Sequence, residues 1–191
     1  MTLIYRKLYR LSGIIFPLTY YFTNKKLTLS VLAVITILIV VVEILRFLLP
    51  AFNQRIFRYF GLILKEQEET RISGTSYFLI ASLLTIFIFE KAIAITALTF
   101  AVFGDAVAAM AGKLFGKIRI REKSLEGSMA CFIACFFIGF ILIYTNLWVN
   151  IKLVFFGALA ATMMEILPIG IDDNLTMPLF TGLIMELVRL L

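Results

Sequence analysis

The sequence predicts an all-α membrane protein, a polytopic bundle of about seven transmembrane helices that forms one integral membrane domain over residues 1–191. Hydrophobic residues make up 62% of the chain and the mean hydropathy is +1.02, which is unlike a soluble domain. A spanning helix needs about 20 mostly apolar residues. Seven stretches approach this length, and no hydrophilic domain separates them: 8–23, 27–49, 73–89, 92–112, 126–145, 151–170 and 174–191.

The first predicted span, 8–23, follows the cations Arg6 and Lys7 and includes Arg10. A basic start before an apolar stretch is also typical of a secretory signal peptide. The residues that follow, Thr23-Asn24-Lys25-Lys26, provide no small-residue cleavage site. We therefore expect an uncleaved first helix.

The second predicted span, 27–49, carries Glu43 and Arg46 near its end. Residues three apart lie on neighbouring helix faces, so these two either form a structural pair or contribute to a polar site. The next segment, 51–65, mixes aromatic residues with two arginines. It fits an amphipathic helix in the membrane interface and equally a simple connector. The span at 73–89 then begins directly at a serine.

The predicted span 92–112 contains one acidic residue, Asp105. A carboxylate in hydrocarbon is costly, so it usually faces a polar cavity and serves a function. The alternative is a structural ion pair with Arg46 or with a lysine. Asp105 is therefore the first candidate functional residue of the chain.

A basic, glycine-punctuated loop follows, from Gly112 to Ser128, with no Walker sequence. Gly112 and Gly116 permit backbone angles closed to other residues, which would let main-chain N–H groups approach an anion. Ser124 begins the next helix, and helix N-termini favour phosphate. The alternative is an ordinary positive-inside loop, with Ser124 as N-cap and Glu126 as a favourable first-turn charge. The loop cations that would neutralise a triphosphate are Lys113, Lys117, Arg119, Arg121 and Lys123.

The span 126–145 holds the two cysteines, Cys131 and Cys135, four apart on one helix face. This placement is poor for a disulfide and insufficient for a metal, so we interpret both as packing residues. The chain has no histidine, which excludes Ser-His-Asp and Cys-His nucleophilic sites and His-ligated zinc. The remaining carboxylates, cations and hydroxyls suit magnesium-assisted phosphoryl transfer.

The last two predicted spans, 151–170 and 174–191, are joined through Asp172-Asp173-Asn174. Asp173 or Asn174 is expected to cap the final helix. Two adjacent carboxylates are equally able to hold Mg²⁺ on phosphate oxygens, and the two roles are compatible.

The net charge of +6 is distributed so that the cytoplasmic segments hold most of the lysines and arginines when the N-terminus is inside. The positive-inside rule therefore favours an N-in, C-out orientation. Asp105, Glu43 and Glu165 then fall near cytoplasmic ends of their spans, beside a cytoplasmic turn that carries Asp172 and Asp173. We expect an integral protein of the cell membrane or an endomembrane, with its active site facing the cytoplasm and no nucleic-acid partner.

Four segments carry a resemblance to known proteins: Gly104-Asp105-Ala106 through Gly112-Lys113-Leu114-Phe115-Gly116-Lys117; Lys123-Ser124-Leu125-Glu126-Gly127-Ser128; Glu165-Ile166-Leu167-Pro168 with Asp172-Asp173-Asn174-Leu175-Thr176-Met177-Pro178-Leu179; and Glu68 to Tyr77 with Ser73-Gly74. Together they resemble the CTP-dependent lipid kinases, the group of dolichol kinase, phytol kinase and CTP-dependent diacylglycerol kinase. The resemblance spans most of the chain. That group often has a histidine after an N-terminal Arg-Lys pair, where this chain has Arg10 nearest.

The Gly-Asp and Lys-Ser-Leu-Glu-Gly pattern is also similar to the phosphatidate cytidylyltransferases, which consume CTP as well. Their pattern usually has Lys-Thr in place of Lys123-Ser124, and it usually ends in a His-Gly-Gly and Asp-Arg block that this chain lacks. The Asp172-Asp173-Asn174 ending favours the kinase group. A transporter or membrane assembly factor that uses Asp105 as a proton or ion site is a further alternative, and it leaves the basic loop unexplained.

The resemblance implies Mg²⁺-assisted phosphorylation of a lipid alcohol by CTP, with a polyprenol, dolichol, phytol-like alcohol or diacylglycerol as acceptor. The catalytic residues it implies are Asp105, Asp173, Lys123 and Glu126. The metal ligands it implies are Asp105, Asp172 and Asp173. The nucleotide-binding residues it implies are Gly112, Lys113, Gly116, Lys117, Arg119, Lys123, Ser124, Gly127 and Ser128.

Overall fold

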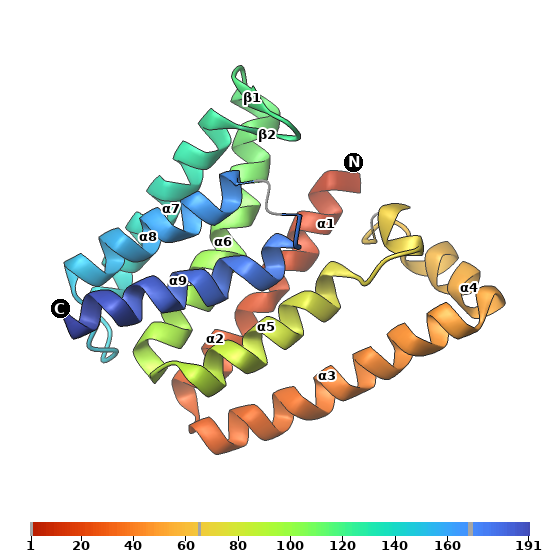
Figure 1. Cartoon of the computed structure of the whole chain (residues 1–191), viewed down its shortest axis with the longest axis horizontal. Coiled ribbons are helices and arrows are strands. Elements are labelled where there is room, and N and C mark those ends of the chain that lie inside the picture. Colours follow the sequence, from red (N-terminus) through yellow and green to blue (C-terminus); the bar gives the residue numbers. More distant parts are fainter. Residues whose placement is uncertain (1, 65, 168–169) are drawn as a thin grey trace.

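The computed structural model describes residues 2–64, 66–167 and 170–191, and its regular elements are helices and one small β-ribbon (Figure 1). The elements are α1 (Thr2–Leu11), η1 (Ser12–Ile14), α2 (Ile15–Phe22), α3 (Lys25–Leu48), α4 (Pro50–Phe60), η2 (Glu66–Glu69), α5 (Gly74–Ile88), α6 (Lys91–Phe115), β1 (Arg119–Ile120), β2 (Lys123–Ser124), α7 (Leu125–Ile143), α8 (Ile151–Ile166) and α9 (Asp173–Leu190). Lys65, at the end of the predicted segment 51–65, and Pro168, in a segment that carries the resemblance, lie outside the described residues.

The predicted all-helical class is confirmed, and each predicted span overlaps helical structure, although α8 ends at Ile166 and residues 168–169 of the predicted span 151–170 lie outside the described residues. Among the described residues, three helices have the length and apolar composition needed to cross a membrane: α3, α6 and α7. Helix α5 is apolar but shorter, with 15 residues. These helices support an integral membrane protein, whereas the full set of seven spans and the N-in orientation remain predictions.

Polar N-caps explain where several of these helices begin. In five caps, the side chain accepts a hydrogen bond from a backbone N–H in the first turn of the following helix. These caps are Asn24, Ser73, Ser124, Asn150 and Asp172. Such a bond satisfies one of the free N–H groups of a helix start. The cap of α9 is therefore Asp172, and the prediction that Asp173 or Asn174 fills this position was wrong, because the Asp172 side chain accepts from Asn174 N at 2.9 Å.

Helix α6 is the centre of the bundle, and α2, α5, α7, α8 and α9 pack around it. Its residue Gly104 permits this packing, because a Cβ at that position would lie within 2.9 Å of the sulfur atoms of Cys131 and Cys135. Both cysteines are buried and free, so their interpretation as packing residues is confirmed. Helix α3 lies at the edge of the bundle, packs mainly on α5, and diverges from α1 and α2 (Figure 1).

Glu43 and Arg46 join α3 to the start of α5. Arg46 donates to Glu43 Oε1 at 2.8 Å and to the backbone oxygens of Glu68 and Arg71, also at 2.8 Å each. Glu43 in turn accepts from the Ser73 backbone N–H at 2.8 Å. The pair is thus a buried structural cluster, and Arg46 is engaged there rather than with Asp105.

Candidate functional site

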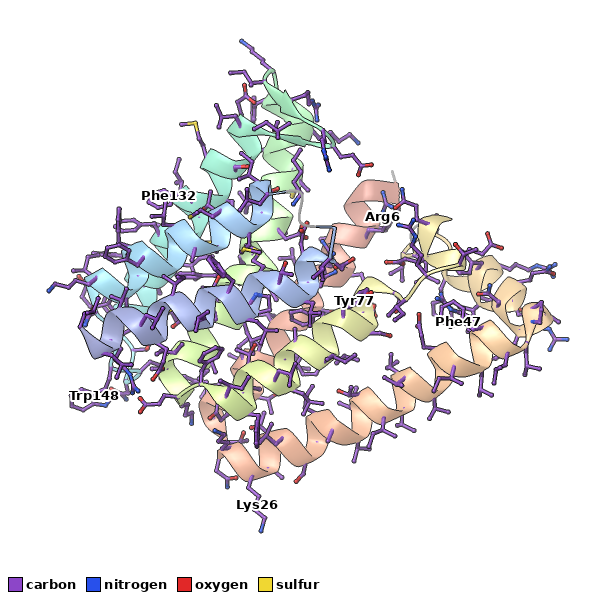
Figure 2. All side chains as sticks on the ribbon, viewed as in Figure 1. Arg6, Lys26, Phe47, Tyr77, Phe132 and Trp148 are labelled. Carbon is purple, nitrogen blue, oxygen red and sulfur yellow. The ribbon has the colours of Figure 1, made fainter. Side chains whose placement is uncertain are left out.

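An open cleft of about 980 Å³ runs from the β-ribbon, past α1 and α6, to the space between α2, α3 and α5. Charged residues gather at one end of it, namely Arg10, Asp105, Lys123, Asp172 and Asp173. Figure 2 shows the side chains around this end, with Arg6 labelled on α1. Residues from the two ends of the chain and from its middle therefore meet in one cleft.

Asp105 projects from α6 into the charged end and pairs with Arg10 of α1. The second guanidinium nitrogen of Arg10, Nη2, lies 4.0 Å from Asp172 Oδ1. Arg10 thus bridges a carboxylate on the central helix and a carboxylate at the start of α9. All three side chains are between 16% and 22% exposed, so the cluster is sheltered but open to a ligand.

The sequence did not identify Arg10 as a site residue. In the sequence it is one of several N-terminal cations, and the positive-inside rule accounts for all of them equally. The available signal for a role of Arg10 was the resembling family, which often has a histidine at the place that Arg10 lies nearest to in this chain. The structure makes it the ion-pair partner of Asp105, in place of the Arg46 or lysine partner that the sequence left open.

Lys123 organises the other side of the charged end. It donates to Asp173 Oδ2 at 2.7 Å and also to the backbone oxygen of Glu165. Asp173 lies just before the predicted span 174–191. Burial raises the pKa of the Asp173 carboxyl above its ordinary value, while the hydrogen bond and charge of Lys123 oppose this shift in its pKa. The lysine is therefore held between α9 and the end of α8.

Much of the predicted loop from Gly112 to Ser128 lies in regular elements, namely the end of α6, the β-ribbon and the start of α7. Gly112 belongs to α6, and Gly116 has φ −65° and ψ 108°, so neither glycine takes the unusual backbone angles expected of it. They are required for close contact instead, because a Cβ on either would lie 2.8 Å from Ser124 Oγ. The loop turns at Arg121, which has φ 56°, and pairs Ile120 with Lys123.

Three predicted residues of this loop make contacts within the protein. Ser124 caps α7 by accepting from Gly127 N at 3.1 Å, as the positive-inside interpretation allowed. Glu126 accepts from Ile118 N at 3.2 and 3.3 Å, which ties the start of α7 to the loop. Ser128 Oγ donates to Glu165 Oε2 at 2.6 Å and is buried.

The cleft brings together part of the predicted site. The predicted residues that line it are Asp105, Gly112, Lys113, Arg119, Lys123, Ser124, Asp172 and Asp173. The other predicted residues lie close in sequence but do not line the cleft: Gly116, Lys117, Glu126, Gly127 and Ser128. The catalytic and nucleotide-binding roles of all these residues remain predictions.

No group of three or more His, Cys, Asp or Glu side chains is arranged to hold a metal ion within the described residues. The predicted set of Asp105, Asp172 and Asp173 is thus not a preformed three-carboxylate site. Asp105 and Asp172 nevertheless converge on one guanidinium, so both face a shared cation position. Mg²⁺ usually binds one or two carboxylates together with substrate phosphates, and these two residues fit that requirement.

Three relatives help to place the chain. An uncharacterised protein of Rickettsia prowazekii is 28% identical over 181 residues, 91% of this chain and 88% of that protein. A Triticum aestivum protein named "Probable phytol kinase, chloroplastic" is 29% identical over 62% of this chain, and the match spans only 45% of the wheat protein. The CTP-dependent diacylglycerol kinase 1 of Schizosaccharomyces pombe is 25% identical over 76% of this chain and 74% of that kinase.

No family model and no solved structure matches the chain. The relatives with a named activity are 25% to 29% identical, and all of them are named as phytol or CTP-dependent diacylglycerol kinases. At this level of similarity, the relatives support the CTP-dependent lipid kinase family for this chain.

Proposed function

We propose that this protein transfers the γ-phosphoryl group of CTP to the hydroxyl of a membrane lipid alcohol and releases CDP. The observation that carries the proposal is the cleft, which joins a cluster of carboxylates and cations to an apolar space between helices. A reaction between a charged nucleotide and a lipid needs both environments side by side. The names of the relatives supply the nucleotide and the class of acceptor.

The charged end would bind the nucleotide through cations that line it. Lys113 and Arg119 are exposed and line the cleft, so their cationic side chains are available to triphosphate oxygens. Asp105 and Asp172 would hold Mg²⁺, which when bound neutralises charge on phosphate oxygens. Arg10, which bridges these carboxylates, is positioned to turn toward the phosphates once the nucleotide is present.

In the transfer step, the lipid hydroxyl oxygen forms a bond to the γ-phosphorus and the bond to the β,γ-bridging oxygen breaks. The proton of the hydroxyl passes to a carboxylate, for which Asp173 and Asp105 are the candidates in the cleft. A loose transition state requires little help from a base. Most of the acceleration would therefore come from holding the hydroxyl and the nucleotide in line.

The site would face the cytoplasm, where CTP is present, because the basic segments around it favour the inside of the membrane. The relatives with a named activity are kinases, so transfer of the CMP group to phosphatidate is not favoured.

The test is CTP-dependent phosphorylation of dioleoylglycerol and of phytol by purified protein, with Asp105→Asn as the variant. We expect Asp105→Asn to lower the turnover number by about 10²-fold or more, because it removes the negative charge of a carboxylate that would hold Mg²⁺. Glu69→Gln is the matched control, since this exposed carboxylate does not line the cleft and should leave turnover unchanged. Wild-type turnover by Asp105→Asn would contradict the proposed site.

A further inference from the structure

The cleft continues beyond its charged end into an apolar arm, which we define by Phe16 of α2, Ile35 and Ile39 of α3, Phe78 and Leu79 of α5, and Val102 of α6. Every side chain of this arm is hydrocarbon. A phosphate or a nucleoside would find no hydrogen-bond partner among these side chains, whereas an alkyl or isoprenoid chain would lose nothing by entering. The chemistry of the apolar arm therefore differs from that of the charged end.

The two parts of the cleft are adjacent along the same helix. Val102 of the apolar arm and Asp105 of the charged end are three residues apart on α6, a rise of about 4.5 Å. Gly13 marks the junction on the opposite side, because a Cβ there would lie 2.7 Å from the Phe78 ring and 3.4 Å from Val102. A molecule with a hydroxyl at Asp105 would place its next carbon atoms in the apolar arm.

The apolar arm also opens toward the outside of the bundle. Helix α3 diverges from α2 after their shared turn, and its side chains project both toward α5 and away from the molecule (Figures 1 and 2). Ile15, which lines the cleft on α2, is 57% exposed. On α3, Ile35 and Ile39 are half-buried in the cleft, while Ile37 and Leu38 are 62% and 61% exposed on the outer face.

We propose that the apolar arm binds the hydrocarbon tail of the lipid alcohol, which enters sideways from the bilayer between α2 and α3. The occupant is a membrane lipid because the apolar arm is hydrocarbon and is continuous with the charged end. The arm also opens between α2 and α3, whose outer faces are apolar. This inference rests on the proposed function for the identity of the hydroxyl group. It adds the binding site of the tail and the route by which the tail arrives.

The test compares two isoleucine-to-tryptophan variants on the same helix, Ile35→Trp within the apolar arm and Ile37→Trp on the outer face. The indole of Ile35→Trp would fill the arm, so we expect the KM for dioleoylglycerol or phytol, whichever is phosphorylated, to rise about tenfold, with the KM for CTP unchanged. Ile37→Trp should match the wild type in both constants. Equal KM values for the lipid in the two variants, with equal melting temperatures, would overturn the inference.

A second measurement needs no turnover. Two probes, a diacylglycerol and a C20 isoprenoid alcohol, each carry a diazirine at the end of the tail and are crosslinked in phosphatidylcholine vesicles. We expect adducts at Phe16, Ile35 or Ile39, and we expect excess unlabelled lipid alcohol to decrease them. The Ile35→Trp variant should lose these adducts, whereas the Ile37→Trp variant should retain them. Labelling confined to outer-face residues such as Ile37 and Leu38, for both probes, would overturn the inference. Competed labelling of the apolar arm in a protein that transfers no phosphate would uphold it and refute the kinase proposal.

Discussion

Arg10 and Lys123 determine how the carboxylates of the cleft are arranged. Arg10 holds Asp105 and approaches Asp172, and Lys123 holds Asp173. Without these cations, like charges from α6 and α9 would face each other in a sheltered space, which is unfavourable. The charged end is therefore held together by ion pairs that a nucleotide and its metal ion would have to rearrange.

Removal of the Arg10 charge tests this arrangement. We expect Arg10→Gln to lower the free energy of unfolding by about 1–3 kcal/mol, because partly buried carboxylates lose a charged donor. The KM for CTP should also rise, whereas Arg10→Lys, which keeps the charge but loses the planar fork, should show smaller changes in both quantities. Melting in detergent and steady-state kinetics provide the two measurements.

Arg55→Gln is the control for Arg10→Gln, since Arg55 is exposed on α4 and does not line the cleft. A melting temperature and a CTP KM for Arg10→Gln that equal those of Arg55→Gln would show that Arg10 is an ordinary surface cation.

The sequence predicted the carboxylates of the cleft better than their partners. Asp105 stands out because an acidic residue inside an apolar run has few structural reasons to be there. Arg10 and the Lys123–Asp173 pair depend on contacts between residues 50 or more positions apart, and no local pattern encodes such a contact. Residue type thus indicated the kind of site, and only the fold supplied its pairings.

The junction of α6 and α7 brings the basic loop to the cleft. A Cβ at Gly127 would lie 2.6 Å from the backbone oxygen of Ala108 and 3.3 Å from Gly112 Cα, so the two helices touch through their backbones here. The sequence predicted both helices and gave the Ser124 cap as one of two alternatives, and both features follow from local composition. It assigned Gly112 and Gly116 a conformational role, because the close approach of two helices cannot be inferred from one segment.

Gly127→Ala measures the importance of this contact. Alanine usually stabilises a helix relative to glycine by about 1 kcal/mol. Here we expect a loss of about 1–3 kcal/mol in the free energy of unfolding, since the added methyl group meets backbone that cannot rotate away. Lower turnover should accompany it, because Lys123 and Ser124 directly precede the displaced helix. An unchanged or higher melting temperature would contradict close packing of α6 and α7.

Helix α6 takes part in the packing of the bundle and in both parts of the cleft. Gly104 packs against Cys131 and Cys135 of α7, the next residue, Asp105, lies in the charged end, and Val102 lies in the apolar arm that α3 completes. Within the part of the chain that the structure describes, three helices have the properties of membrane spans, and the other helices there are shorter or less apolar. Whether these other helices cross the membrane depends on the bilayer, which acts on the assembled bundle rather than on single segments.

The N-in orientation is testable with two single cysteines. In a Cys131→Ala/Cys135→Ala background, Arg121→Cys lies on the basic loop and Asn146→Cys lies between α7 and α8, and both native side chains are exposed. In intact cells, we expect a membrane-impermeant maleimide to label Asn146→Cys alone, because the positive-inside rule places the basic loop in the cytoplasm. Labelling of Arg121→Cys alone would invert the orientation, and labelling of both would contradict a span at α7.

The central claim is that the protein moves the terminal phosphate of CTP onto a lipid hydroxyl. The most direct measurement incubates the purified protein with dioleoylglycerol, phytol, a polyprenol and phosphatidate, in parallel with CTP labelled at the α or the γ phosphate. Label from the γ position in one of the lipid alcohols, with release of CDP, is the predicted result. Label from the α position in lipid, with release of pyrophosphate, would contradict the claim and identify a cytidylyltransferase instead.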